Sequence, residues 1–120
     1  MDFNFEWDNA KALANTKNHG VTFEQAATVL LDSLALTVFD HAHSQNEERG
    51  FTIGQSSNRT LLIVVHTFAT LSPTRARVRI ISARKPTTNE RRSYEKERKR
   101  GLSTVIELSG SERHDGVHLG

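Results

Sequence analysis

The sequence predicts an α+β fold, with two N-terminal helices, a four-stranded antiparallel sheet and a C-terminal helix. Two segments with helix-capping residues come first in the chain, and a third follows the strand-like segments. The four strand-like segments follow one another without helices between them, which favours antiparallel pairing. A chain of 120 residues is the size of one domain, so we expect a single domain over residues 1–100 and an extension over residues 101–120 whose end is mobile.

The two N-terminal helices are marked by the residues at their ends. Asp8 is a good N-cap for a helix over residues 9–18, and Gly20 ends that helix. Thr22 and Gln25 have the spacing of a capping box, with apolar residues at helical spacing behind them. The pattern therefore predicts two short helices before the first strand.

Four strand-like segments follow, in the order LALTVFD, RGFTIGQS, TLLIVVHTF and ARVRIISAR. The second and third form a hairpin across residues 57–59, and ATLSPTR is a turn before the fourth. The third segment is almost continuously apolar, so we expect a central strand covered on both faces. Gly54 marks a bulge or a place of close packing within the second segment.

A C-terminal helix is predicted after Pro86, which ends the extended region. Thr87 and Glu90 again have capping-box spacing, and the helix is expected to run to about Arg100. Residues 104–108 are strand-like, whereas the last dozen residues have no core to join.

Positive charge is concentrated in one part of the chain. The formal net charge is +2, yet residues 75–100 contain eleven Lys and Arg against three Asp and Glu, a balance of +8. Such a block favours a polyanionic partner, with nucleic acid ahead of an acidic protein or a membrane surface. Arg77 and Arg79 share one face of their strand, whereas Arg84 has the opposite parity and joins them only if the strand twists after Ile81. Alternatively, these charges only solvate an exposed face.

Several kinds of site are excluded by the residues that the chain contains. There is no cysteine, which excludes disulfides, cysteine-ligated zinc and a cysteine nucleophile. No Walker lysine loop, GxSxG, GxGxxG or HExxH motif occurs. His41 and His43 lie near Glu47 and Glu48, but their spacing matches no known zinc pattern. We therefore predict no metal and no other cofactor.

The sequence shows no sign of export or membrane insertion. The N-terminal segment MDFNFEWDNAK is acidic and aromatic, unlike a secretory signal. No stretch approaches the roughly 20 apolar residues of a membrane helix. We therefore expect a cytoplasmic protein without a membrane partner.

Four stretches, in their order along the chain, resemble the BrnT family of bacterial toxins: FEWDNAKALANTKNHGVTFEQAATVL, EERGFTIGQS, LLIVVHTF and RVRIISARKPTTNERRSYE. The resemblance covers residues 3–95. Its most specific residues are Trp7, Asp8, Lys11, Lys17, His19, Gly20, the segment 79–84, Glu90, Arg91 and Tyr94. The sequence departs from the family pattern in its longer FATLSPTRA loop, in Gly50 before the IG pair and in its tail beyond residue 100.

The resemblance implies a RelE-like fold and a defined activity. BrnT proteins are endoribonuclease toxins of type II toxin-antitoxin systems that arrest translation, and the resemblance implies that cleavage needs no metal ion. It also implies a BrnA-like ribbon-helix-helix antitoxin as partner, in a possible two-plus-two heterotetramer. Operator DNA is then contacted only through the antitoxin, and RNA is the substrate.

Metal-free RNA cleavage requires three things of the protein: removal of the 2′-hydroxyl proton, stabilisation of a negatively charged phosphorane and protonation of the departing 5′-oxygen. We expect Arg79 and Arg84 to bind and stabilise the scissile phosphate, because a guanidinium fork can bind two oxygens. Arg91, Lys11 and Arg77 are expected to make lesser contacts with RNA.

Proton transfer has four candidates, in the order His66, His19, Glu48 and Tyr94. His66 stands near the end of the central strand, and histidine titrates near neutral pH. A buried, hydrogen-bonded histidine is the alternative at that position, and His19 could instead cap the end of its helix. The pKa of a tyrosine is normally far above neutrality, so Tyr94 is better suited to stacking on a base or orienting a phosphate.

Two other functions stay open at this point. The first is a non-catalytic basic domain that binds RNA or an acidic partner without cutting it. The second is an inactive toxin homologue that acts as a corepressor with its antitoxin. RNA fragments with cyclic-phosphate ends, formed in the presence of a chelator, distinguish the ribonuclease from both.

Overall fold

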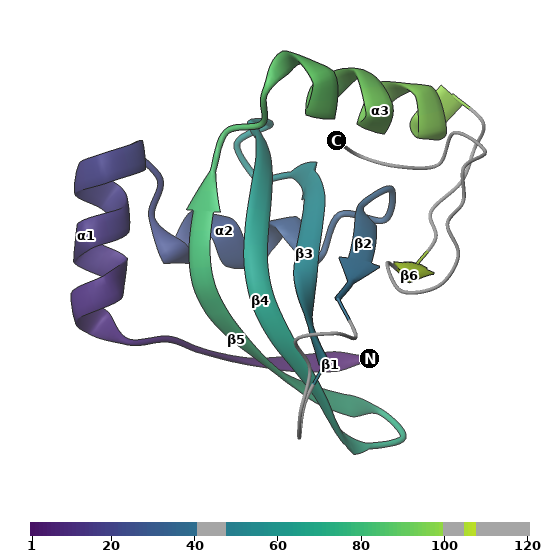
Figure 1. Cartoon of the computed structure of the whole chain (residues 1–120). Coiled ribbons are helices and arrows are strands. Elements are labelled where there is room, and N and C mark those ends of the chain that lie inside the picture. Colours follow the sequence, from purple (N-terminus) through teal and green to yellow (C-terminus); the bar gives the residue numbers. More distant parts are fainter. Residues whose placement is uncertain (41–47, 100–104, 108–120) are drawn as a thin grey trace.

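The computed structural model describes residues 1–40 and 48–99, together with the backbone of residues 105–107. The elements within these ranges are β1 (Asp2–Glu6), α1 (Asn9–His19), α2 (Phe23–Val29), β2 (Leu36–Phe39), β3 (Glu48–Gln55), β4 (Leu61–Ser72), β5 (Arg75–Arg84), α3 (Thr88–Lys99) and β6 (Val105–Glu107) (Figure 1). The α+β class and the three helices are as predicted. No helix in these ranges is long and apolar enough to cross a membrane.

The sheet is mixed, which corrects the prediction of four antiparallel strands. Within the described residues it has six strands, in the order β1-β5-β4-β3-β2-β6. The pairs β2–β3, β3–β4 and β4–β5 are antiparallel, as predicted. β1 adds a parallel pair with β5 at one edge, and β6, within the predicted strand-like residues 104–108, adds a parallel pair with β2 at the other.

β1 was not predicted, although its residues carry a strand pattern. The segment DFNFE alternates polar and aromatic side chains, and its half-buried positions are Phe3 and Phe5. Side chains alternate between the faces of a strand, so both phenylalanines turn towards one side of the sheet. There they pack against the same core as α1 and α2, and Glu6 points to the other side.

Both N-terminal helices begin, and α1 also ends, where the capping residues predict. Asp8 accepts a hydrogen bond from the backbone N–H of Lys11 at 3.0 Å, and Thr22 accepts one from Gln25 at 3.0 Å. Gly20 follows α1 with φ of +70°, a left-handed conformation that glycine adopts without steric cost.

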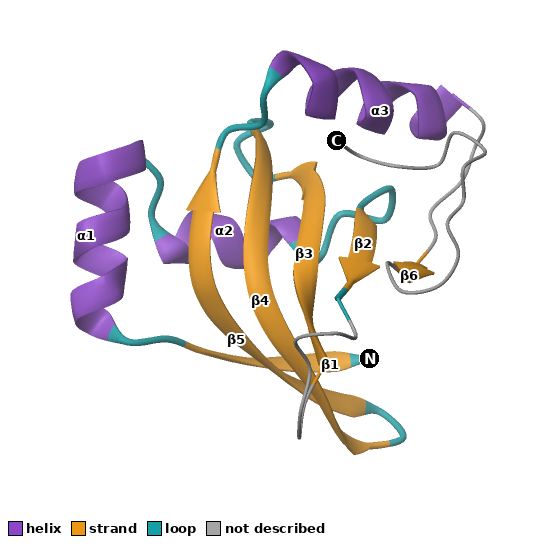
Figure 2. Ribbon diagram, in the orientation of Figure 1, coloured by secondary structure: helices purple, strands orange, loops and turns teal. Residues whose placement is uncertain are grey.

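α2 lies across one face of the sheet, here called the helix face, and α1 lies beside β5 at the edge of the sheet (Figure 2). The core on this face consists of Val21, Phe23, Ala26, Val29, Leu62, Val64, Val78, Ile80 and Ala83. On the opposite side α3 covers one end of the sheet, and Tyr94 packs there with Ile53 and Ile63. Leu62, Ile63 and Val64 of β4 are all buried, so the predicted central strand covered on both faces is confirmed.

The structure answers two questions that the sequence raised, one about Gly54 in β3 and one about the turn between β4 and β5. A Cβ atom on Gly54 would lie 2.9 Å from the Cβ of Ala35, so close packing explains this glycine. The predicted ATLSPTR turn was wrong, because β4 continues to Ser72 and β5 begins at Arg75. Most residues of the predicted turn therefore belong to the two strands and lengthen the β4–β5 hairpin.

The start of α3 has the predicted capping box. The backbone N–H of Thr87 donates to Glu90 Oε1 at 2.7 Å, and the N–H of Glu90 donates to Thr87 Oγ1 at 3.2 Å. The described helix runs to Lys99. Arg100 and the tail that was predicted to be mobile lie outside the described residues.

Candidate functional site

A β-bulge in β5 determines which arginines share a face of the sheet. Ile80 pairs with His66 and Ser82 pairs with Val65, so Ile81 is an extra residue in the ladder. A single extra residue reverses the alternation of every side chain that follows it. The bulge therefore changes the direction of the strand after Ile81, as Arg84 requires in order to share a face with Arg77 and Arg79.

Arg77, Arg79 and Arg84 consequently lie on the same side of the sheet, here called the arginine face. Val78, before the bulge, and Ala83, after it, are both buried in the helix-face core. They are five residues apart, whereas two residues on the same face of a regular strand are separated by an even number. The strand neighbour of Arg84 is Ile63, which belongs to the core beneath α3. The arginine face is thus the side of the sheet that α1 and α2 do not cover.

Glu6 lies between Arg77 and Arg79 on this face. Arg79 donates from Nε and from Nη2 to Glu6 Oε2, at 3.2 Å and 3.0 Å. The Nε atom of Arg77 is 3.6 Å from the same oxygen. The side chain of Arg79 stays 50% exposed, so the cluster is accessible from solvent. Sequence reasoning missed Glu6, although the alternation of DFNFE could have indicated it.

An open pocket of about 400 Å³ adjoins this cluster, between the end of β1 and the start of α1. It is lined by Glu6, Trp7, Asp8, Lys11 and Arg79. Two residues that the sequence predicted as RNA contacts, Lys11 and Arg79, therefore meet here. They come from distant parts of the chain, and the parallel pairing of β1 with β5 brings them together.

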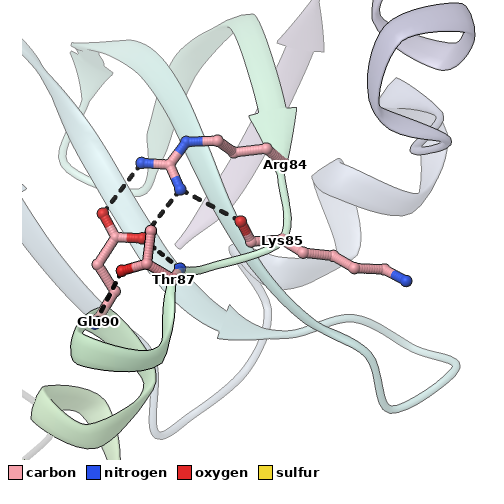
Figure 3. Close-up of polar contacts among 4 residues, drawn as sticks. All are labelled: Arg84, Lys85, Thr87 and Glu90. Atoms are coloured by element: carbon pink, nitrogen blue, oxygen red, sulfur yellow. Dashed lines mark hydrogen bonds and ion pairs between the residues drawn. The ribbon is translucent and has the colours of Figure 1, made fainter.

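Arg84 makes a forked ion pair with Glu90 (Figure 3). Arg84 donates from Nη1 to Glu90 Oε1 at 2.9 Å and from Nη2 to Oε2 at 3.0 Å, and Nη1 also donates to the carbonyl oxygen of Lys85 at 3.2 Å. The hydrogen bonds that Arg84 donates to Glu90 are the main reason that the pKa of Glu90 is lowered to about 2, and the same bonds raise the pKa of Arg84. This pair joins the end of β5 to the first turn of α3.

His66 lies on the helix face and is fully buried. Its Nδ1 atom is 3.1 Å from the carbonyl oxygen of Thr67, which can only accept, so Nδ1 carries the proton and Nε2 accepts from Thr52 Oγ1 at 2.7 Å. Burial lowers the pKa of His66 to about 4. The structure shows the buried, hydrogen-bonded histidine given above as the alternative, and the sheet separates it from the arginine face, which argues against its predicted catalytic role.

Tyr94 is also buried, with 2% of its surface exposed. Its ring packs in the core beneath α3, and its hydroxyl donates to Asp32 Oδ2 at 3.5 Å. Burial is the main cause of the raised pKa of Tyr94. The predicted stacking of this ring on an RNA base is therefore corrected, because the ring contacts the protein interior.

The other predicted residues are exposed but lie apart from the Glu6 cluster. Glu48 pairs with Phe68, whose ring packs on the helix face, so Glu48 shares that face. His19 is the last residue of α1, at the opposite end of the helix from the pocket, and Arg91 is exposed on α3. In the described part of the chain no three His, Asp or Glu side chains gather as metal ligands, and His41, His43 and Glu47 lie outside it.

A comparison with protein families places the chain in a known family. Residues 7–90 match the family of the ribonuclease toxin BrnT of type II toxin-antitoxin systems, over more than half of the chain. The chain belongs to the BrnT family. BrnT proteins are ribonuclease toxins, so an RNA target and a protein antitoxin follow from membership. The BrnT match includes Lys11, Arg77, Arg79 and the Arg84–Glu90 pair. No curated protein matches the chain.

Proposed function

We propose that this protein cleaves RNA at the arginine face, without a metal ion, and thereby arrests translation. The observation that carries the proposal is the convergence of Arg77 and Arg79 on Glu6, with Lys11 across the adjoining pocket. Preorganised cations of this kind stabilise the charge that develops on a phosphorane. Membership of the BrnT family supports RNA as the molecule cleaved.

The geometry favours one distribution of roles. Arg79 and Arg77 hold the scissile phosphate, and the carboxylate of Glu6 takes the proton from the 2′-hydroxyl as its oxygen attacks phosphorus. The bond from phosphorus to the 5′-oxygen then breaks, and the ammonium group of Lys11 gives a proton to the departing oxygen. The products are a 2′,3′-cyclic phosphate and a 5′-hydroxyl. Glu6 thus replaces His66 as the proposed base, because it is the carboxylate in contact with both arginines.

Arg84 has a positioning role in this proposal. Both of its terminal nitrogens are bound to Glu90, so it holds the end of β5 and the start of α3 in place. Arg91 is exposed on α3 and attracts the RNA backbone, as does Arg98 in the last turn. Neither residue needs to touch the reacting phosphate.

The proposed antitoxin is a BrnA-like ribbon-helix-helix protein that covers the arginine face with acidic side chains. Two toxins and two antitoxins then form the complex, and the antitoxin carries the contact with operator DNA. The proposed location is the cytoplasm, where translation takes place. An active face is the natural surface for an inhibitor to cover, and its cations explain attraction to an acidic partner as well as to RNA.

Induced expression and a cleavage assay test the proposal together. The unchanged protein should stop growth and should cut labelled RNA in the presence of a chelator, leaving cyclic-phosphate ends. Arg79→Ala should abolish both effects, whereas Arg92→Ala, which removes an exposed arginine of α3, should leave both intact. RNA binding without fragments would show a non-catalytic domain. Undiminished growth arrest with Arg79→Ala would overturn the proposed site.

A further inference from the structure

We infer that the pocket between β1 and α1 binds one nucleotide of the RNA, with its base stacked on the indole ring of Trp7. The inference rests on the proposed ribonuclease function and assigns a contact beside the proposed scissile phosphate. None of the cleavage steps uses Trp7, although it lines the pocket with Arg79 and Lys11.

The size and the lining of the pocket suit a nucleotide. A volume of about 400 Å³ lies within the range of roughly 300–1,000 Å³ that is usual for small-molecule sites. One aromatic ring, two cations and two carboxylates surround it. Single-stranded RNA is held in this way elsewhere, by bases stacked on aromatic rings and cations along the backbone.

Trp7 is held in place by the elements on either side of it. β1 ends at Glu6, which is bound to Arg79, and Asp8 caps α1. The indole ring meets Phe23 edge to face, with centroids 5.9 Å apart and planes inclined by 79°. A contact of this kind uses at most one face of the indole ring. Trp7 is half-buried, since it packs against the helix-face core, and it also lines the pocket, where a base can reach it.

The mixed charge of the pocket favours a nucleotide over a bare anion. Arg79 and Lys11 attract phosphate, whereas Glu6 and Asp8 repel it and accept hydrogen bonds from donors. The amino groups of bases are such donors, and they distinguish a nucleotide from a sugar phosphate. Inorganic phosphate offers only the charge that the carboxylates oppose. The pocket should therefore bind RNA in preference to phosphate.

Fluorescence tests the inference directly, because Trp7 is the one tryptophan of the sequence. The probe is a five-nucleotide single-stranded RNA with methylated 2′-hydroxyls, so that cleavage cannot occur. We expect saturable quenching of the Trp7 emission by this RNA, and none by ribose 5-phosphate or inorganic phosphate. Binding of a dye-labelled copy of the RNA, followed by anisotropy, with unchanged Trp7 emission would overturn the inference.

Substitutions of Trp7 give a second measurement. Trp7→Phe keeps a stacking surface and should bind the dye-labelled RNA within about threefold of the unchanged protein, whereas Trp7→Leu should bind about tenfold more weakly. Equal affinity of the Leu and Phe variants, with matching circular dichroism spectra, would overturn the inference.

The two proposals fail in different ways. Cleavage that depends on Arg79 but is unaffected by Trp7→Leu removes the nucleotide pocket and leaves the ribonuclease. Quenching of Trp7 by RNA that is never cleaved, even with free 2′-hydroxyls, removes the ribonuclease and leaves the pocket.

Discussion

The side-chain amide of Asn15 pairs with both backbone groups of Ala83. Nδ2 donates to the carbonyl oxygen of Ala83 at 2.9 Å, and Oδ1 accepts from its N–H at 3.0 Å. β1 pairs with β5 only from Arg75 to Arg79, so Asn15 takes the place of a neighbouring strand beyond that point. Nδ2 also donates to the carbonyl oxygen of Val21 at 2.9 Å. A single buried residue thereby fixes α1 against the edge of the sheet.

Replacement of Asn15 by alanine should lower the free energy of unfolding by about 2–4 kcal/mol, because three buried hydrogen bonds are lost and backbone groups are left unsatisfied. Urea unfolding followed by circular dichroism measures this change. Asn18→Ala, on the exposed surface of α1, is the control and should change stability by less than about 0.5 kcal/mol. Similar values for the two variants would contradict the role of Asn15.

Glu6→Gln should reduce RNA cleavage by about 10²–10⁴-fold if Glu6 is the proposed base. The substitution removes a negative charge beside Arg77 and Arg79, so RNA should bind at least as tightly as before. Single-turnover cleavage and anisotropy separate the two effects. Asp2→Asn changes another acidic residue on the same face of β1 and is the matched control. Cleavage at the normal rate by the Glu6 variant would show that another group removes the proton.

His66 should make stability depend on pH between about 6.5 and 4. Its folded pKa, about 4, lies below the ordinary histidine value of 6.5, so the unfolded chain takes up a proton first as the pH falls. Stability is therefore full above pH 6.5 and declines by about 3 kcal/mol towards pH 4. Glutamine does not titrate, so the stability of the His66→Gln variant should fall by about 3 kcal/mol less over this pH range. Urea unfolding at pH 7.5 and 4.5 measures the difference.

The same variant tests the catalytic role that the sequence predicted for His66. Folded His66→Gln protein should cleave RNA at a rate close to that of the unchanged protein, because the histidine lies on the helix face. A loss of more than about 100-fold, with the fold intact by circular dichroism, would return His66 to the mechanism.

Glu90 should contribute to the free energy of unfolding, and this contribution should be lost as the pH falls from about 4.5 to 2. Its folded pKa of about 2 lies below the ordinary glutamate value of 4.5, so its contribution is full above pH 4.5 and disappears as the pH falls to 2. We expect a contribution of about 1–2 kcal/mol, since Arg84 is partly exposed and solvent screens the pair. Glu90→Gln should remove it, whereas Glu95→Gln, on the exposed side of α3, should not. Equal pH profiles for both variants would argue against the Arg84–Glu90 pair.

Local features of the fold could be predicted from the sequence because they depend on neighbouring residues. Asp8, Thr22 and Thr87 cap helices through hydrogen bonds to residues three positions away. The long β4–β5 hairpin could not be predicted, because Pro73 suggests a turn of several residues and only pairing across the hairpin shows its length.

The candidate site was predicted in part. Arg79 and Lys11 meet at one pocket, yet Glu6 was missed because its strand pairs in parallel with a segment 73 residues away. The side of the sheet on which His66 lies, and the burial of Tyr94, depend on packing between distant elements. A one-residue bulge at Ile81 has no signal in the sequence pattern, but it decides the position of Arg84.

The parallel pair of β1 and β5 also bears on the synthesis of this protein. Glu6 leaves the ribosome more than seventy residues before Arg77 and Arg79 do. A contact between such distant residues forms only after the chain between them is complete. An unfinished chain released before β5 has neither arginine and lacks the partner strand of β1, so it cannot form the proposed cleavage site.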